Sequence, residues 1–320
     1  MAGKIPTVST CQKENAVRVI LFDVEHGFCA FIRTPNGHTI LIDCGKGPNF
    51  SPTEYLLRNE ICVPLSKLVV SHAHEDHIED FRRVSARLNP SILLAHNLNW
   101  DFVKAQSGAS GHESLDAYIA GKDAKFNGGW VPDPDYGMSV QSFALEPNRA
   151  QQISGSINSA VNNCSFVTVA SFAGTKYAPK FLFGGDMEEA GWNELLATNP
   201  AFRQAVRGTW FYFPSHHGHS SGFSTKLYDA MGKPCLNLIS VRRNDESRDG
   251  RYSEDGFALG WPVGGEQRKM LSTTHDGSIF IDVDSEGLPN VYTRFLPDNL
   301  QQSQSAALMT LREILGRVES

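Results

Sequence analysis

The sequence predicts an α+β protein in which two β-sheets pack face to face and helices cover their outer sides. Runs rich in β-branched and aromatic residues recur in both halves of the chain, and each half also contains amphipathic helical segments. The chain has 320 residues, of which 41% are hydrophobic, enough to bury one large core. We therefore expect a single domain that spans residues 1–320.

The first half of the chain shows clear boundaries between its elements. The Pro35-Asn36-Gly37 turn separates two β-rich runs and predicts a hairpin. Ser51-Pro52 provides an N-cap and a first-turn proline for a helix. The predicted elements are strands at residues 17–23, 28–33, 38–43 and 68–70 and helices at residues 51–59 and 80–88.

Residues 95–137 interrupt this pattern, because they are rich in Gly, Asn, Asp, Ser and aromatic residues and contain only a short helical patch at residues 112–120. We expect an irregular insertion there, which either packs on the parent domain or contacts a substrate. The second half then resumes with predicted strands at residues 164–170, 180–183, 209–213, 236–241, 278–283 and 290–295 and helices at about 188–198, 224–231 and 305–318.

Four side chains that can bind metal lie within six residues, directly after the apolar run 68–70. His72, His74, Asp76 and His77 form an H-x-H-x-D-H array. Alternate residues of an extended segment share a face, and the following turn can bring the last two ligands to a second point nearby. Imidazoles with carboxylates suit Zn²⁺ and also accept Mn²⁺ or Fe²⁺. The array predicts a site for two metal ions; the alternative is a polar loop that happens to hold three histidines.

Two later segments end in residues of the same kind. The apolar run 181–183 leads through two glycines to Asp186, and the run 211–213 leads to the pair His216 and His217. Glycine permits close backbone approach at such strand ends. We therefore expect these residues to converge with the array on one site.

Together, these segments resemble the metallo-β-lactamase superfamily, whose fold is an αββα four-layer sandwich with one or two metals at one edge. More narrowly, Asp23-Val24 with Gly27, residues 39–45, the array, and residues 183–186 and 214–218 look like the hydrolase domain of the competence protein ComEC and its soluble relatives.

The resemblance implies a role for each residue of the cluster. His72 and His74 would hold the first metal, Asp76 and His77 the second, and Asp186 would bridge them. We expect His217 to be the last ligand and His216 to face the substrate, although a shift of one residue in register would exchange the two. Asp43 is expected to orient a ligand histidine through its ring N–H.

One departure from the superfamily concerns the third histidine that it usually places in the first metal site. Between His77 and Asp186 this chain offers only His96 and His112, and the expected position, residues 143–147, contains Glu146 instead. Glu146 is either an oxygen ligand or a solvated turn residue. An oxygen-rich first site would shift the metal preference from Zn²⁺ toward Mn²⁺.

The expected activity is metal-dependent hydrolysis by a metal-bridging hydroxide held by Asp76 and Asp186. His216 or His219 would donate a hydrogen bond or proton to the leaving group. The ComEC-like resemblance implies a phosphodiesterase or nuclease that acts on nucleic acid or a smaller phosphodiester. The alternatives are a carbon-ester or amide hydrolase, such as a lactonase, thioesterase or β-lactamase, and a metal-stabilised binding subunit without catalytic activity.

Composition narrows the setting of this chemistry. The net charge of −6 argues against a wholly basic nucleic-acid-binding surface, although a local positive groove is compatible with it. Neither an apolar run of about 18 residues nor a secretory h-region is found, so we expect a cytoplasmic protein with no membrane span. The six scattered cysteines are expected to be reduced thiols. Partner proteins are not indicated.

Overall fold

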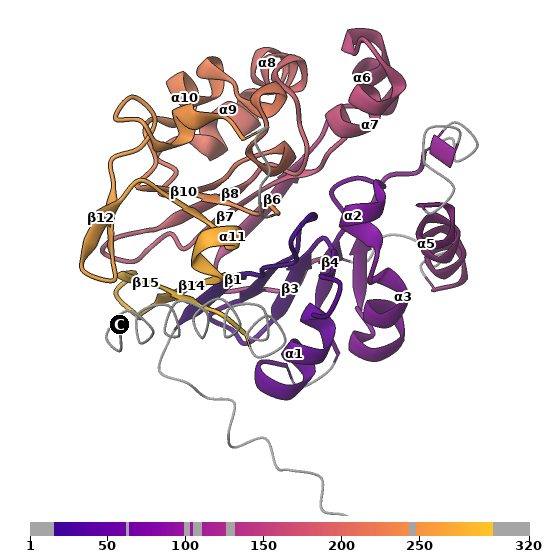
Figure 1. Ribbon diagram of the computed structural model, residues 1–320, viewed down its shortest axis with the longest axis horizontal. Coiled ribbons are helices and arrows are strands. Elements are labelled where there is room, and N and C mark those ends of the chain that lie inside the picture. Colours follow the sequence, from indigo (N-terminus) through magenta and orange to yellow (C-terminus); the bar gives the residue numbers. More distant parts are fainter. Residues whose placement is uncertain are drawn as a thin grey trace, which may run out of the picture.

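The computed structural model describes six stretches of the chain, residues 16–61, 64–98, 103–104, 111–125, 132–242 and 248–296. Most of the strands in these stretches form two large sheets that lie face to face, and helices cover the outer side of each (Figure 1). The layer order is helix, sheet, sheet, helix. The predicted α+β, αββα four-layer sandwich is confirmed.

The first sheet has seven strands and comes mainly from the first half of the chain. Its strands are β1 (Val17–Leu21), β2 (Ala30–Arg33), β3 (Thr39–Ile42), β4 (Lys67–Val69), β5 (Ile92–Leu94), β14 (Ser278–Val283) and β15 (Pro289–Arg294). The spatial order is β15-β14-β1-β2-β3-β4-β5. Strands β2 and β3 form the predicted antiparallel hairpin, whereas β3, β4 and β5 run parallel.

The second sheet has six strands. They are β6 (Ser139–Phe143), β7 (Val167–Ser171), β8 (Lys180–Phe183), β9 (Phe211–Phe213), β10 (Leu236–Ile239) and β13 (Met270–Ser272), and a separate ribbon consists of β11 (Trp261–Val263) and β12 (Glu266–Arg268). The order is β13-β10-β9-β8-β7-β6. Because β8, β9, β10 and β13 are parallel, their carboxyl ends lie at the same edge of the sheet.

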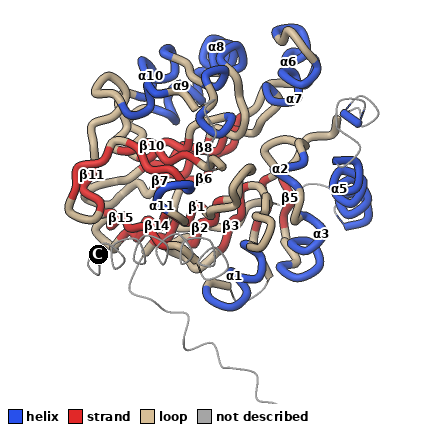
Figure 2. The backbone as a smooth tube through the Cα atoms, viewed as in Figure 1, coloured by secondary structure: helices blue, strands red, loops and turns tan. Residues whose placement is uncertain are grey.

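Helices lie on the outer sides of the two sheets and at their edges (Figure 2). On the side of the first sheet are α1 (Pro52–Asn59), α2 (Glu75–Ile78), α3 (Phe81–Arg83), η2 (Val84–Leu88) and α5 (Gly111–Lys125). The second half contributes α6 (Pro147–Ile153), α7 (Ile157–Asn163), α8 (Glu189–Thr198), α9 (Pro200–Val206), α10 (Thr225–Met231), α11 (Thr273–Asp276), η3 (His216–Gly218), η4 (Ser220–Gly222) and η5 (Gly250–Ser253). None of the helices in the described stretches is both long and apolar enough to cross a bilayer.

Two helical predictions need correction or extension. The single helix expected at residues 80–88 is instead a short α-helix, α3, that continues as the wider π-helical turn η2, because the apolar spacing alone does not distinguish these windings. Within the expected insertion at 95–137, α5 is longer than the predicted patch, and it packs on α3 through Phe81 and Tyr118, whose ring centroids lie 4.9 Å apart. Residues 99–102, 105–110 and 126–131 of that insertion and the expected helix at 305–318 lie outside the described residues.

Three apolar clusters hold the four layers together. Alternation along the strands explains them, because neighbouring side chains point to opposite faces. In β8, Phe181 and Phe183 enter the cluster between the two sheets, whereas Leu182 enters the cluster beneath the helices of the second sheet. In β1, Val19 faces the other sheet and Ile20 faces the helices on the first sheet. Both sheets are therefore buried on two faces, and polar groups concentrate at their edges.

Candidate metal centre

Three distant segments of the chain meet at one edge of the sandwich. The extended residues after β4 carry His72 and His74, and the following helix α2 carries two further members of the array. Asp186 follows β8 and His217 follows β9, and these two strands are parallel neighbours. The sequence-based expectation that strand ends converge on one site is met by the positions of these elements.

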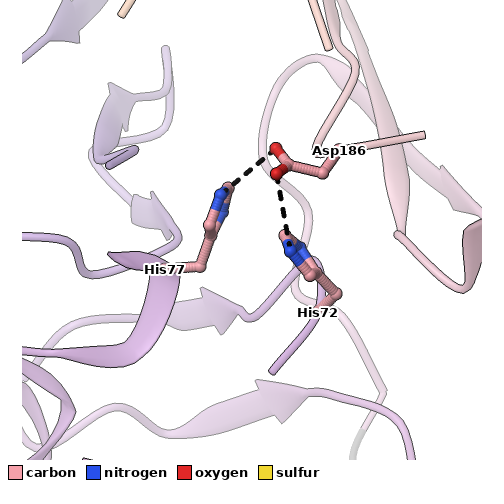
Figure 3. A group of neighbouring side chains, drawn as sticks. All are labelled: His72, His77 and Asp186. Atoms are coloured by element: carbon pink, nitrogen blue, oxygen red, sulfur yellow. Dashed lines mark ion pairs between the residues drawn. The ribbon is translucent and has the colours of Figure 1, made fainter. Parts of the chain in front are cut away.

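Asp186, from the second half of the chain, lies beside His72 and His77 from the first half (Figure 3). Its Oδ1 lies 3.2 Å from Nε2 of His77, and its Oδ2 lies 3.7 Å from Nε2 of His72. All three side chains are buried, and their potential ligand atoms lie within 4.8 Å of one another. A single divalent ion could therefore contact a carboxylate oxygen and two imidazole nitrogens here.

A second group shares one member with the first. Nε2 of His217 lies 3.0 Å from Oδ2 of Asp76 and 3.7 Å from Oδ2 of Asp186, while Nε2 of His77 lies 3.8 Å from the same Asp76 oxygen. The potential ligand atoms of Asp76, His77 and His217 again lie within 4.8 Å of one another. Because His77 belongs to both groups, the distances alone do not divide the ligands between two ions.

His74 approaches the cluster from the side of His72. Its Nδ1 lies 3.0 Å from Nε2 of His72. Two ligands of one tetrahedral zinc ion, each at 2.0–2.1 Å, are separated by about 3.3 Å, so this spacing fits a shared ion. When no metal lies between them, one of the two facing nitrogens must carry a proton, since two lone pairs would repel each other.

Hydrogen bonds orient three of the rings. His77 Nδ1 lies 2.7 Å from Oδ2 of Asp43, and His217 Nδ1 lies 3.2 Å from the carbonyl oxygen of Ser240. Both partners only accept, so each Nδ1 donates. The Ser71 hydroxyl donates to Asp43 and lies 3.1 Å from His72 Nδ1, which can then donate to it. Each ring therefore directs Nε2 toward the cluster, as the sequence predicted for Asp43 and one ligand histidine.

The polar atoms that face the centre of the cluster lack hydrogen-bond partners. Among the described residues, the buried Nε2 atoms of His77 and His217 and Oδ1 of Asp186 lie close to one another or to Asp76 but make no hydrogen bond of acceptable geometry. Leaving buried polar atoms unpaired costs free energy, and native proteins rarely do so without a reason. Imidazole nitrogens and carboxylate oxygens are the ligands that zinc prefers. The residues present therefore fit a divalent metal.

Burial and the carboxylates act in opposite directions on the histidine pKa values. Burial disfavours protonation of His77 and His217, but Asp186 and Asp76 outweigh it, so the pKa of His77 lies well above the ordinary 6.5 and that of His217 is also raised. At His72 burial dominates, and its pKa lies well below 6.5. Burial opposes ionisation of Asp76 and Asp186, yet the imidazoles lower both carboxyl pKa values. Without metal, protons supply the positive charge that the carboxylates attract.

Local backbone geometry allows this approach. Gly185 has φ +54, and a Cβ on it would lie 2.8 Å from Cβ of Ser165 and 3.1 Å from Cβ of Ser71. Only glycine fits there without displacing a neighbour, and it places Asp186 beside the array. His216 and His217 also have positive φ values of 52 and 53, which direct the two neighbouring rings differently.

A pocket of about 220 Å³ opens over the cluster. Its lining includes His26, His74, Asn158, Asp76 and Asp186 and the three histidines 216, 217 and 219 of the β9–α10 connection. His216 does not join either ligand group, since its Nδ1 lies 2.7 Å from the hydroxyl of Ser221. Of the histidine pair, the structure thus brings His217 to the carboxylates and places His216 on the wall of the pocket.

Glu146 is not brought to the cluster. It is exposed, begins α6 as its N-cap residue, and lines a different cavity of about 410 Å³ together with Pro147, Gln151 and Cys164. The hypothesis that Glu146 completes the first metal site is therefore wrong. Glu146 was expected just before the strand that is now β7, but α6 and α7, which were not predicted, lie between the two.

Several residues around the centre gave no recognisable signal in the sequence. Ser71, Ser221 and Ser240 make hydrogen bonds to site histidines, and Asn158 reaches the pocket from α7. Isolated serines and asparagines are common in loops, so only the Ser71 position, directly before the array, offered a hint.

No family model and no curated protein matches this chain. Similar solved structures include a long-form RNase Z from yeast (10% identity, TM-score 0.44, 87% of this chain and 42% of that chain). They also include CmlA, a diiron β-hydroxylase from Streptomyces venezuelae (13%, 0.39, 72% and 45%), and Igni18, a metallo hydrolase from the archaeon Ignicoccus hospitalis (14%, 0.38, 71% and 87%). This chain spans less than half the length of the first two.

All three TM-scores lie below 0.5, so these likenesses identify neither a substrate nor a metal. Two sheets pack face to face between outer helices, and the H-x-H-x-D-H segment, Asp186 and His217 meet where β4, β8 and β9 end. The chain has the metallo-β-lactamase fold.

Proposed function

We propose that this protein is a metal-dependent hydrolase and that its substrate is a phosphodiester. The observation that carries the proposal is the meeting of two overlapping groups, His72-His77-Asp186 and Asp76-His77-His217, whose buried inward-facing atoms include several without a hydrogen-bond partner. A pocket opens directly over them. Structural metal sites are usually closed, whereas catalytic ones keep an open position.

Zn²⁺ is the metal that we propose, with two ions per chain, and Mn²⁺ is the alternative. The donors that lie together are the imidazoles of His72, His74, His77 and His217 and two carboxylates. Exclusion of Glu146 removes the argument for an oxygen-rich first site, and a nitrogen-rich set favours zinc over manganese.

The protein groups have separate tasks in this proposal. Two divalent ions, when bound, would supply the charge that lowers the pKa of a water molecule toward neutrality and polarises the bond under attack. Asp76 and Asp186, whose oxygens lie 3.0 and 3.2 Å from the imidazoles of His217 and His77, would hold the ions and orient that water. His216 and His219, on the pocket wall, are placed to hydrogen-bond the substrate. Asp43 and Ser71 keep two of the rings in the required orientation.

Two arguments favour phosphorus over carbon as the reacting centre. The sequence segments that resemble the ComEC hydrolase domain include the whole ligand set, and that resemblance implies phosphodiester hydrolysis of nucleic acid or of a smaller substrate. In addition, the walls of the pocket carry several imidazoles and the amide of Asn158, which can hydrogen-bond phosphoryl oxygens. The described lining includes no Lys or Arg, although Arg242 interacts electrostatically with His26, so bound cations would supply most of the charge that balances the phosphate.

Hydrolysis of bis-(p-nitrophenyl) phosphate by the purified protein, loaded with Zn²⁺ or Mn²⁺, tests the proposal. We expect turnover of this phosphodiester and no turnover of a lactone. The reverse result would favour the carbon-centred alternative. Turnover of neither substrate by a metal-loaded protein would favour a metal-stabilised binding subunit.

The double variant Asp76→Ala/His77→Ala should abolish turnover. Because His77 pairs with the buried Asp43, this variant also risks the fold, so Asp76→Asn is the companion variant. It keeps the side-chain volume and every contact of His77 with Asp43. We expect at least a 10³-fold loss of kcat with an unchanged circular dichroism spectrum.

A further inference from the structure

The hydroxyl of Ser221 touches two histidines that line the pocket and are not part of either ligand group. Oγ of Ser221 lies 2.7 Å from Nδ1 of His216 and 2.8 Å from Nδ1 of His219. The two ring centroids are 5.1 Å apart, and both rings line the pocket over the metal centre. Since each ring has Ser221 at its Nδ1, Nε2 is the nitrogen that remains for a substrate.

The protons of this group can be assigned by counting donors and acceptors. A serine hydroxyl has one proton, so it donates to one ring and accepts from the other. The backbone N–H of Ser221 donates to Nδ1 of His219 at 3.1 Å, which fixes that nitrogen as an acceptor. The hydroxyl must then donate to the same nitrogen, because two lone pairs would otherwise face each other at 2.8 Å. It follows that Nδ1 of His216 carries a proton and donates to Ser221.

A second observation agrees with this assignment. Oε1 of Glu188 lies 4.0 Å from Nδ1 of His216, and the same oxygen accepts a hydrogen bond from the Asn162 side chain, which holds it in place. A carboxylate at this distance favours a proton on the nitrogen that faces it. The carboxylate of Asp249 also interacts electrostatically with His219, but no described hydrogen bond or ion pair joins it to Nδ1 of that ring.

We propose that Ser221 is a positioning residue that fixes opposite tautomers on two wall histidines. His219 then presents Nε2–H, a hydrogen-bond donor, to the pocket, whereas His216 presents the unprotonated Nε2, an acceptor. The tautomers follow from the contacts alone, and only their use in hydrolysis rests on the proposed function.

This arrangement has a consequence for the substrate. An N–H donor beside the metal centre suits an anionic or carbonyl oxygen, and an acceptor about one ring away suits a hydroxyl or amine. The geometry therefore selects a substrate that carries an O–H or N–H group near the oxygen that His219 binds. A phosphodiester with a neighbouring hydroxyl meets this requirement, and a simple dialkyl phosphate meets only half of it.

Nuclear magnetic resonance of the Zn²⁺-loaded protein tests the tautomers directly. Long-range ¹H–¹⁵N correlation of ¹⁵N-histidine distinguishes Nδ1–H from Nε2–H rings, and His216→Asn and His219→Asn variants assign the signals. With both rings neutral, we expect the Nδ1–H pattern for His216 and the Nε2–H pattern for His219. The opposite pattern, or the same tautomer on both rings, would overturn the proposal.

Substitutions at Ser221 separate positioning from general stability. Ser221→Ala should shift His216 toward a mixture of tautomers and lower kcat/KM by about tenfold, with metal content unchanged. Ser221→Thr should restore both values, because it keeps the hydroxyl. Ser220→Ala, at the exposed neighbouring position, is the matched control and should resemble the parent protein. Unchanged tautomers in Ser221→Ala would contradict the proposed role.

The two proposals fail in different ways. Absence of phosphodiester hydrolysis with the expected tautomers would sink the proposed function and leave the Ser221 assignment standing. Phosphodiester hydrolysis with other tautomers would overturn the Ser221 assignment and leave the proposed function standing.

Discussion

Nδ1 of His77 lies 2.7 Å from Oδ2 of Asp43, and both side chains are completely buried. The same carboxylate accepts two further hydrogen bonds, from the backbone N–H and the hydroxyl of Ser71. Because Asp43 can only accept, the ring of His77 must turn Nε2 toward Asp186. The ligand is thus oriented by the fold before a metal binds, which lowers the entropic cost of forming the site.

Asp43→Asn should weaken metal binding. The amide retains the size of the carboxylate and tolerates the positive φ of 58 at this position, but its NH₂ group would face donors. We expect metal affinity to fall by about 10- to 100-fold. The free energy of unfolding should fall by about 1–3 kcal/mol. Competition with a zinc chelator and urea denaturation measure these effects. Asp229→Asn, at an exposed position on α10, is the control. Equal affinity in Asp43→Asn and the parent protein would refute the orienting role.

His216→Asn and His217→Asn should have different effects. Both positions have positive φ, so asparagine imposes the same backbone demand on each. His217→Asn removes the nitrogen that lies 3.0 Å from Asp76, and we expect loss of bound metal. His216→Asn should keep its metal and lose about 100-fold in kcat. Elemental analysis beside steady-state kinetics measures both effects, and metal loss in His216→Asn alone would reverse the assignment.

Gly185→Ala should damage the site through packing. The new Cβ would meet Ser165 and Ser71 and push Asp186 away from the array. Gly174 provides a matched control, because its φ is also positive, at +85, and nothing lies within 4 Å of an added Cβ. We expect Gly174→Ala to cost about 1 kcal/mol of stability and Gly185→Ala several times as much, with loss of metal affinity. Thermal unfolding with and without Zn²⁺ compares them; equal effects would mean that the close packing is unimportant.

Metal binding should release protons near neutral pH. Asp186 and Asp76 raise the pKa of His77 and His217 against the effect of burial, so protonation of both rings is favoured when no metal is bound. A metal can bind only after Nε2 of each loses its proton. Calorimetric titration with Zn²⁺ in buffers of different ionisation enthalpy counts these protons. Zero proton release at pH 7 would contradict the assignment.

The same shifts set the pH dependence of the metal-free protein. A raised folded-state pKa gives stability that is complete below the unfolded value of about 6.5 and is lost as the pH rises through the folded value. His77 and His217 should therefore make the metal-free protein less stable as the pH rises above 7. His72, whose pKa is lowered, acts below pH 6.5 in the opposite direction. Unfolding curves after chelation check the sign.

The parts of the fold predicted best are those built from apolar β-rich runs. The strands β8 and β9, which together hold four phenylalanines, a tyrosine and a leucine, bury both faces and were recognisable by composition. Strand β6 reads Ser-Val-Gln-Ser-Phe and lies partly exposed at an edge, so its polar residues concealed it. The helices α6, α7 and α9 have seven residues each, too few to show a reliable helical period.

The site was predictable where strand ends carry unusual residues. The array, Asp186 and the histidine pair each follow a recognisable strand, and the structure brings them together. Glu146 was misplaced because its position depended on where two short helices run, which no local pattern specifies. The roles of Ser71 and Ser221 depend on tertiary contacts between segments or across a tight turn, and serine carries no distinctive spacing.

Anomalous diffraction at the zinc edge, from crystals grown with Zn²⁺, tests the central claim most directly. We expect two peaks a few ångströms apart, one within bonding distance of Nε2 of His72 and Nδ1 of His74 and the other within bonding distance of Asp76 and His217, with Asp186 between them. A map without a peak in this cluster, although zinc is present in the crystal, would contradict the account.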